Sequence, residues 1–263
     1  MGSEFTPLLF DVTDDLAVRS AAAEVEQIVG EEGLWGLVNN AGLPGFGPLM
    51  HIPEQEVRRQ FEVNVFGLLR VTQISLPLLG ATKNVSHPPG RIVNISSTRG
   101  KIAYPMLGSY SASKHAVEAF SDALRCELLL YGVDVIVIEP GSIRTPIWEK
   151  AESIDRSPYE DTDYTPSLKR LLEDVAEQKH KALPVTVVSR VIRLALTVKR
   201  PKARYAIPDS RFTRWLFPRY LPDCWLDWII SRFLGMTRRV QSRSPSDNAP
   251  SSLPGRSSRR WRA

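Results

Sequence analysis

The sequence contains little cysteine and little histidine, and this limits its covalent and metal chemistry. Its 263 residues include two cysteines, Cys126 and Cys224, and four histidines. Two cysteines cannot build the disulfide framework of a small secreted domain, and the scattered histidines show no metal-ligand spacing. We therefore expect a protein of a reducing, cytoplasmic compartment that binds no metal.

The sequence also lacks a long hydrophobic run and a secretory leader. A membrane-spanning helix needs about 20 consecutive apolar residues, and no stretch of the chain reaches that length. The N-terminus shows no basic segment followed by an apolar run. Because 43% of the residues are hydrophobic, the chain can still fill a full core. We therefore predict a soluble folded protein.

Acidic residues are scarce only in the C-terminal quarter of the chain. The formal net charge is +5, yet residues 1–198 carry 19 Lys and Arg against 25 Asp and Glu. Residues 199–263 carry 15 Lys and Arg against 4 Asp and Glu. The larger part of the chain is thus mildly acidic, so the overall positive charge does not indicate a nucleic-acid-binding protein. We expect no nucleic-acid partner.

Short β-branched runs alternate with longer helical stretches from Leu8 to Ile207, which is typical of parallel strands joined by crossover helices. The predicted strands are residues 8–10, 36–39, 91–96, 133–139 and 203–207. The predicted helices are residues 16–31, capped by Asp14 or Asp15, then 54–79, 109–131, 167–180 and 184–198. We expect an α/β fold with a doubly wound parallel sheet of the Rossmann type.

Three side chains predict a proton-transfer site. Tyr110 and Lys114 stand four residues apart on a predicted helix, so they share one face and can meet. An ammonium beside a phenol favours the phenolate and lowers the Tyr110 pKa, as a general acid/base requires. Ser97 follows a predicted strand, at the edge where open parallel sheets bind ligands, and can hydrogen-bond a substrate oxygen. Taken alone, Tyr110 and Lys114 could instead be an exposed helix pair.

Five motifs resemble, in order and spacing, those of short-chain dehydrogenase/reductases. They are Val38-Asn39-Asn40-Ala41-Gly42, Asn64, Ser97, Tyr110 with Lys114, and Pro140-Gly141-Ser142-Ile143-Arg144-Thr145. The resemblance covers about residues 8–207 and is strongest to the subgroup of hydroxysteroid and retinol dehydrogenases. It implies an oxidoreductase that interconverts an alcohol and a carbonyl with NAD or NADP. The implied substrate is a hydrophobic small molecule, such as a steroid, a retinoid or an aliphatic compound.

The resemblance also implies a role for each motif residue. Tyr110 would be the acid/base, Lys114 would lower its pKa and bind the nicotinamide ribose, Ser97 would orient the substrate oxygen, and Asn64 would hold a water relay. The implied cofactor-binding residues are Asp11, Val12, Asn39, Ala41, Gly42, Tyr110, Lys114, Pro140, Gly141, Ile143 and Thr145. Ordinary structural alternatives remain: a strand-to-turn junction at residues 39–42, a helix-interior Asn64, an N-cap at Asp11 and a simple turn at Pro140 and Gly141.

The family's glycine-rich loop Thr-Gly-x-x-x-Gly-x-Gly, which binds the cofactor pyrophosphate, is absent from the sequence. The chain begins at what resembles the third strand of the fold, and residues 1–5 are interpreted as a vector-derived leader. We therefore expect an N-terminally truncated sheet with an exposed hydrophobic edge, and weak or no activity for the chain as written. It is either a fragment of an active dehydrogenase or a natural short form, a non-catalytic binding or regulatory protein that binds cofactor poorly.

Residues 6–240 are expected to form one domain, in which residues 146–183 and 208–240 cover the active site as a substrate lid. Trp148, Tyr159 and Tyr164 offer one apolar wall of this lid. Residues 212–233 mix aromatic, aliphatic and arginine side chains, so they could form a pocket wall, a membrane-surface helix or a single-strand nucleic-acid surface. We favour the first and retain peripheral membrane contact through residues 211–234.

Residues 241–263 are expected to be a disordered basic tail. The resemblance implies a homo-oligomer formed through helices 54–79 and 109–131.

Overall fold

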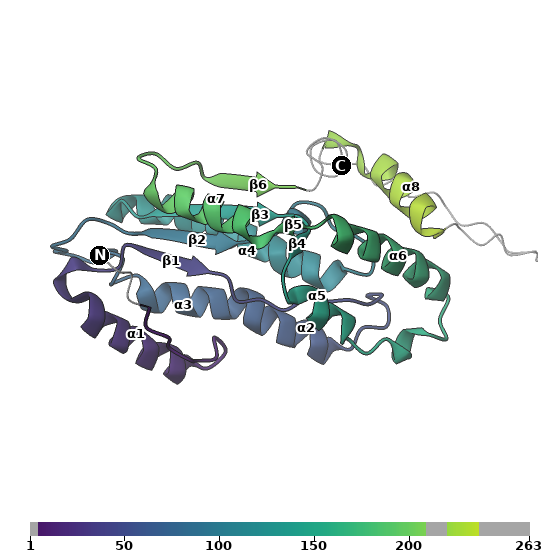
Figure 1. The fold of residues 1–263 in the computed structure, drawn as a ribbon, viewed down its shortest axis with the longest axis horizontal. Helices are drawn as coiled ribbons and strands as arrows, with labels where there is room; N and C mark the ends of the chain where they lie inside the picture. Colours follow the sequence, from purple (N-terminus) through teal and green to yellow (C-terminus); the bar gives the residue numbers. More distant parts are fainter. Residues whose placement is uncertain (1–4, 209–219, 237–263) are drawn as a thin grey trace, which may run out of the picture.

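A four-stranded parallel sheet forms the centre of the protein. The computed structural model describes residues 5–208 and 220–236 (Figure 1). Strands β1 (Gly36–Asn39), β2 (Arg91–Ile95), β3 (Asp134–Pro140) and β6 (Arg204–Ile207) lie side by side in that order. The predicted strands at 36–39, 91–96, 133–139 and 203–207 are confirmed to within one residue at each end. The predicted α/β fold with a parallel sheet is therefore confirmed.

Helices cover the sheet on both faces, as the apolar character of the strands requires. Val93 and Ile136 pack against Ala195 of α7 (Val185–Thr197) on one face. On the other face, Ile92 and Val135 pack against side chains at the ends of α3 (Leu68–Ser75) and α4 (Gly108–Glu127). Figure 1 shows α7 in front of the sheet and α4 behind it. The helix predicted at 109–131 continues through η4 (Leu128–Tyr131) and ends at Gly132, whose φ of 71° is left-handed.

The N-terminal segment departs from prediction. Residues 8–10 form no strand, and Leu9 is fully exposed. Strand formation needs a neighbour to satisfy the backbone groups, and within the described residues no strand pairs with the outer side of β1. Helix α1 (Asp15–Val29) follows, with η1 (Gly30–Glu32) at its end. Asp14 caps it as expected, because its carboxylate accepts hydrogen bonds from the backbone N–H groups of Leu16 and Ala17.

The helix predicted at 54–79 is interrupted. It consists of α2 (Glu54–Phe61), a π-helical turn η2 (Glu62–Gly67) and α3, which ends at Ser75. The early end has a simple cause, since Pro77 has no N–H to continue the helical hydrogen bonding. The π-helical turn contains Asn64, and such turns often occur at functional sites.

A second layer of helices covers the carboxyl ends of the strands. It contains α5 (Ile147–Glu152), η5 (Ser157–Tyr159), α6 (Thr165–Lys181) and α8 (Asp223–Leu234). The two-stranded pair β4 (Ile143–Arg144) and β5 (Leu183–Pro184) joins the start of α5 to the end of α6. Helix α6 confirms the prediction at 167–180, and α7 confirms the helix expected from Pro184. Helix α5 stands where only a polar segment was expected.

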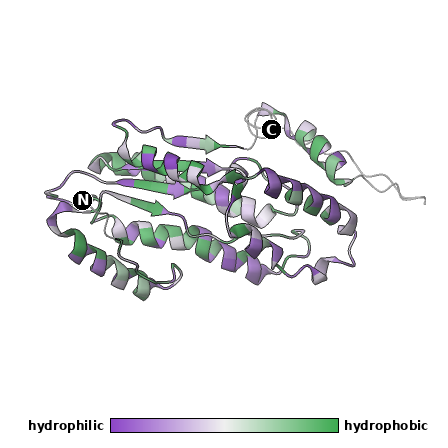
Figure 2. Cartoon of the chain, in the orientation of Figure 1, coloured by the Kyte–Doolittle hydropathy of each residue, from purple (hydrophilic) through white to green (hydrophobic). Residues whose placement is uncertain are grey.

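Several sequence predictions concern residues outside the described part of the chain. They include most of the leader at 1–5, the segment 209–219 with Phe212 and Trp215, and the tail at 241–263. Within residues 220–236, Leu234 of α8 is buried against α6, whereas Trp225 and Trp228 are exposed. Figure 2 shows α8 as largely hydrophobic and α6 as largely hydrophilic. No helix of the described part is both long and apolar enough to cross a membrane.

Candidate active site

A cavity of about 950 Å³ lies at the carboxyl ends of β1, β2 and β3. Its floor comes from the residues that directly follow these strands, among them Asn40, Ser97 and Gly141. Its far wall comes from α5 and α6, through Trp148 and Leu171. The site is therefore built where the topology of an open parallel sheet places ligands.

Ser97, Tyr110 and Lys114 meet at this cavity. Ser97 follows β2 in extended backbone, and its hydroxyl accepts a hydrogen bond from the Arg99 N–H at 3.2 Å. Tyr110 and Lys114 lie one turn apart on α4, with the Lys114 Nζ 5.9 Å from the centroid of the Tyr110 ring. The Tyr110 and Ser97 side chains are hydrogen-bonded to each other. All three line the cavity, so the proximity predicted from their spacing is present.

The pKa of Tyr110 is raised from its ordinary value. Burial of the phenol is the main cause, and the hydrogen bond to Ser97 and the positive charge of Arg99 oppose it only in part. Lys114 is not among the causes of this shift, and its expected lowering of the Tyr110 pKa stays a prediction. Lys114 instead donates a hydrogen bond from Nζ to the Ile95 carbonyl oxygen at 2.8 Å.

Burial lowers the pKa of Lys114 to about 8, because the ammonium is removed from water. The negative charge of Glu118, one turn further along α4, opposes this effect. Lys114 is 6% exposed, so it reaches solvent only through the cavity that it lines. A lysine with this pKa can gain or lose a proton near neutral pH.

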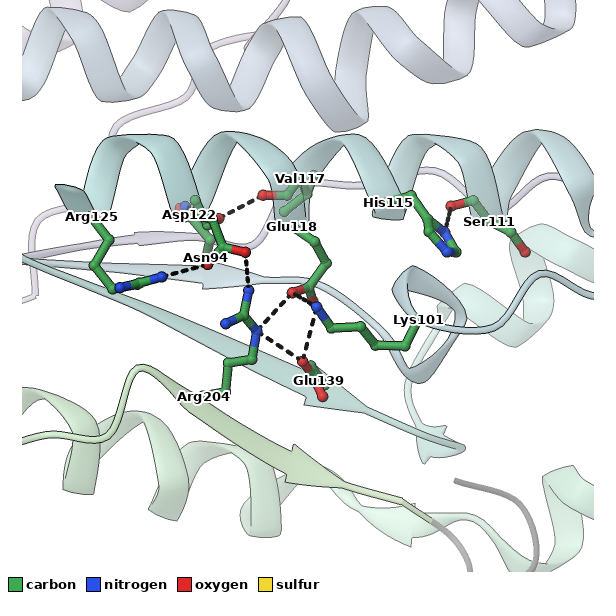
Figure 3. A network of polar contacts seen from close by, with 11 residues as sticks. Asn94, Lys101, Ser111, His115, Val117, Glu118, Asp122, Arg125, Glu139 and Arg204 are labelled. Atoms are coloured by element: carbon green, nitrogen blue, oxygen red, sulfur yellow. Dashed lines mark hydrogen bonds and ion pairs between the residues drawn. The ribbon is translucent and has the colours of Figure 1, made fainter. Parts of the chain in front are cut away.

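An ionic network holds the side chain of Glu118 in place (Figure 3). The Glu118 carboxylate pairs with Lys101 Nζ at 2.7 Å and with Arg204 Nε at 3.1 Å. Glu139, which is buried on β3, shares both cations at 3.9 and 3.4 Å. Figure 3 shows Lys101 and Arg204 reaching the two carboxylates from opposite sides. The negative charge of Glu118, which opposes the desolvation of Lys114, is thus held in place by Lys101 and by Arg204 of β6.

Asn64 joins the loop after β1 to α4. Its Oδ1 accepts a hydrogen bond from the Leu43 N–H at 2.7 Å, and its Nδ2 donates to the Leu43 carbonyl at 3.0 Å and to Ser113 Oγ at 3.1 Å. A side chain added at Gly42 would lie 3.4 Å from Asn64 Oδ1 and 3.9 Å from Lys114 Nζ. The bare glycine therefore leaves the approach to Lys114 open. The water relay assigned to Asn64 stays a prediction.

The predicted cofactor-binding residues fall into two groups. Those that line the cavity with Tyr110 and Lys114 are Gly42, Pro140, Gly141, Ile143 and Thr145. These residues, with the two donors and the open backbone at Gly42, fit the nicotinamide end of an NAD(P) molecule. Their binding roles stay predictions.

The second group lies outside the cavity lining. The Asn39 amide is engaged in the core, where it donates to Thr72 Oγ1 at 2.9 Å and to Asn94 Oδ1 at 2.8 Å. Asn40 lines the cavity in its place, and Ala41 does not line it. The Asp11 carboxylate accepts hydrogen bonds from the backbone N–H and hydroxyl of Thr13, which lower its pKa. The carbonyl of neighbouring Val12 accepts a hydrogen bond from an arginine of α3. Adenine contacts by these two residues remain untested.

Comparison with known proteins identifies the family. Residues 1–155 match the family described as short chain dehydrogenase. The chain is 46% identical over 230 residues to the NADPH-dependent 3-dehydrocapnine reductase of Ornithobacterium rhinotracheale, an alignment that covers 88% of this chain and 81% of that protein. It is 34% identical over 245 residues to human retinol dehydrogenase 5, covering 85% and 73%. The chain belongs to the short-chain dehydrogenase/reductase family.

A solved structure supports the same conclusion for the fold. A short-chain dehydrogenase from Streptomyces avermitilis superimposes with a TM-score of 0.59 at 28% identity, covering 75% of this chain and 68% of that one. The predicted family and enzyme type, an NAD(P)-dependent short-chain dehydrogenase/reductase, are confirmed, and retinol dehydrogenases are among its relatives, as predicted.

Sequence reasoning missed several cavity residues of this short-chain dehydrogenase/reductase, among them Arg99 and Arg156. The position of Arg99, two residues after Ser97, was a signal that could have found it. Arg156 had no such signal, because only the fold of the α5–α6 segment brings it to the cavity. Of the three aromatic residues expected at one wall, Trp148 lines the cavity. Tyr159 is buried in the cluster beneath it.

Proposed function

We propose that this short-chain dehydrogenase/reductase interconverts an alcohol and a carbonyl group on a hydrophobic small molecule. The observation that carries the proposal is the meeting of Ser97, Tyr110 and Lys114 at one wall of a cavity whose other wall is apolar. That apolar wall is supplied by Leu171, Leu172 and Val175 of α6. A carbonyl compound lying between the two walls can place its oxygen against the polar side chains.

The side chains divide the chemistry between them. When bound, the nicotinamide cofactor supplies or accepts hydride. Tyr110, whose raised pKa keeps the phenol protonated at neutral pH, donates its proton to the carbonyl oxygen during reduction. The Ser97 hydroxyl, held beside the phenol, hydrogen-bonds the same oxygen and fixes its position. Lys114, one turn along α4 from Tyr110, can bind the cofactor ribose, and Asn64 can hold a water relay that links Lys114 to solvent and returns the proton.

The relatives suggest finer features of the reaction. We propose NADPH as the preferred cofactor and a 3-dehydrocapnine-like ketone as a candidate substrate, because the relative at 46% identity is named for both. Steroids and retinoids remain candidates through the retinol dehydrogenases at 34% identity.

A Tyr110→Phe variant tests the proposal. Loss of the proton donor should lower kcat for ketone reduction by about 10²–10⁴-fold, since general acid catalysis contributes on that order. NADPH affinity, measured by isothermal titration, should stay within about twofold because Phe keeps the ring. If the wild-type protein neither binds NADPH nor reduces any ketone, that result would favour the non-catalytic alternative. Unchanged kcat in Tyr110→Phe would refute the acid/base role.

A membrane-surface role for α8 is a second, compatible proposal. Trp225, Trp228, Ile229 and Phe233 recur at helical spacing on α8 and are all 40% exposed or more. An exposed aromatic and aliphatic helix face is typical of interfacial binding, which would bring the enzyme to lipid-dissolved substrates. Sedimentation with phosphatidylcholine vesicles tests this, with Trp225→Gln/Trp228→Gln as the variant. Equal pelleting of both proteins would argue against it.

The remaining organisation is also proposed. The single domain at 6–240 and the lid role of residues 146–183 are supported by α5 and α6, which form one wall of the cavity. A homo-oligomer through α2–α3 and α4 is supported by the exposure of Phe66, Leu129 and Leu130, which lie on or next to these helices. Sedimentation velocity tests the oligomer, and a monomer at micromolar concentration would exclude it.

A further inference from the structure

Lys101 links three elements of the candidate active site through its ammonium group. It directly follows η3 (Thr98–Gly100), the short helical turn that comes after Ser97. Its Nζ pairs with the Glu118 carboxylate of α4 at 2.7 Å and lies 3.9 Å from Glu139 Oε1 of β3 (Figure 3). One cation therefore bridges the turn after β2, helix α4 and strand β3.

Each of these three elements carries a group of the site. Ser97 caps η3, and Tyr110 lies two turns before Glu118 on α4. Pro140, which lines the cavity, directly follows Glu139 at the end of β3. The Ser97 hydroxyl donates to the Pro140 carbonyl oxygen at 3.4 Å, and the Ser97 and Tyr110 side chains are hydrogen-bonded to each other. Ser97 thus contacts groups of the same two elements, α4 and β3, to which Lys101 is paired.

The turn between Ser97 and Lys101 is tight and packs closely on α4. The Gly100 N–H donates to the Ser97 carbonyl oxygen at 2.9 Å. A side chain added at Gly100 would lie 3.0 Å from the Lys114 carbonyl oxygen and 3.1 Å from Glu118 Cγ. The bare glycine therefore lets the turn lie directly on the part of α4 that carries Lys114. Because closely packed interiors transmit small displacements, a shift at Lys101 reaches Ser97.

The contact between Lys101 and Glu118 is largely shielded from water. Their side chains are 17% and 5% exposed, so removal of one partner leaves the charge of the other uncompensated. Arg204 pairs with Glu118 and Glu139 at 3.1 and 3.4 Å, but it comes from β6, which contributes no residue to the described cavity lining. Of the two cations that share these carboxylates, Lys101 is therefore the one that adjoins a side chain of the site.

We propose that Lys101 is a positioning residue for the reaction, and that its pairing with Glu118 and Glu139 holds the Ser97 hydroxyl against Tyr110. Lys101 lies outside the described cavity lining and acts through Ser97. This inference rests on the proposed function and adds to it a residue that sets the geometry of the reacting pair from outside the cavity.

The variant Lys101→Met tests the inference, with Arg91→Met as its matched control. Arg91 is 16% exposed, close to the 17% of Lys101, and pairs with Asp134 at 3.4 Å at the opposite ends of β2 and β3 from the cavity. We expect Lys101→Met to lower kcat for reduction of 2-decanone with NADPH by about 10- to 100-fold, because misplaced groups cost up to that order, and Arg91→Met to stay within about twofold. Lys101→Arg keeps the cation and should retain most of the rate.

Combining Lys101→Met with Ser97→Ala tests whether Lys101 acts through Ser97. In the Ser97→Ala background, Lys101→Met should lower kcat by less than about threefold, because the hydroxyl that it positions is already gone. Equal fold-losses in the two backgrounds would overturn the inference. Equal losses in Lys101→Met and Arg91→Met would overturn it too, since they would indicate a general effect of lost stability. If Lys101→Met does not fold, Lys101→Gln replaces it in each comparison.

Fluorine NMR decides the inference without turnover. In protein labelled with 3-fluorotyrosine, the signal that disappears in Tyr110→Phe belongs to Tyr110. Ser97→Ala should move this signal, Lys101→Met should move it in the same direction, and Arg91→Met should leave it in place. If wild type reduces no ketone, the proposed function fails and this measurement still applies. A Tyr110 signal that stays in place in Lys101→Met would overturn the inference.

Discussion

Replacing Lys114 by methionine makes the energetic effect of its buried ammonium measurable. Lys114 is 6% exposed and its pKa lies at about 8 in the folded protein, below the ordinary value of 10.5 that applies in the unfolded chain. Desolvation is the main cause, and methionine keeps the length of the side chain while removing the charge. The variant therefore isolates the ionisation of one group.

The sign and size of the effect follow from proton linkage. Between pH 8 and 10.5 the unfolded chain binds more protons at Lys114 than the folded protein does, so wild-type stability rises with pH across this window. The difference between the two pKa values corresponds to a destabilisation of about 3 kcal/mol at pH 7. By pH 9.5 much of this is regained. We expect wild type to gain about 2 kcal/mol relative to Lys114→Met between pH 7 and 9.5.

Urea unfolding at pH 7, 8, 8.5 and 9.5 measures this difference. The change with pH is more informative than either absolute value, because the packing difference between lysine and methionine is the same at every pH. Lys169→Met, at an exposed lysine of α6, is the matched control and should follow wild type at every pH. Parallel pH profiles for wild type and Lys114→Met would refute the argument, since they would mean that burial does not perturb Lys114.

Three further changes test other parts of the structure. Glu118→Gln should move the Lys114 pKa below about 8, and the same pH series measures this shift. It should also destabilise the fold by about 3–5 kcal/mol, because two partly buried cations, Lys101 and Arg204, lose a carboxylate. An unshifted pH profile would contradict the first expectation. Asn94→Ala removes an acceptor of the buried Asn39 amide and should cost about 1–3 kcal/mol in urea unfolding, whereas wild-type stability would mean that the pair is not needed. Asp14→Ala should lower the free energy of unfolding by about 1 kcal/mol, because α1 loses its cap. Asp14→Asn keeps the hydrogen-bond acceptor and should therefore retain most of the stability. An equal loss of stability in both variants would exclude the capping hydrogen bonds as the cause.

Much of the fold could be predicted because local pattern and tertiary structure agree. The apolar run of β3 could only be a strand buried on both faces, and Gly132 marked the end of the helix before it. The secondary-structure predictions were wrong where a segment depends on contacts with another part of the chain. Residues 8–10 have the composition of a strand but pair with no neighbouring strand, and the helix from Glu54 is broken at Asn64 by contacts with the loop after β1.

The proximity of the three side chains of the candidate site could also be predicted from the sequence. The spacing of Tyr110 and Lys114 on a helix, and the place of Ser97 after a strand, were enough to bring the three side chains together. Their protonation was not predictable from spacing. The Tyr110 pKa depends on burial, on Ser97 and on Arg99, and none of these effects is a property of the helix alone.

The sequence by itself determined the order of most strands and helices along the chain, the meeting of Ser97, Tyr110 and Lys114, and the family. These depend on periodicity, on capping residues and on short spacings, which are local properties of the chain. Only the tertiary structure placed Asn39 in the core and Arg156 at the cavity, and only it put Glu118 between Lys101 and Arg204. These placements bring together residues far apart in the chain. Burial and charge in a folded interior depend on such neighbours, and the sequence order does not contain them.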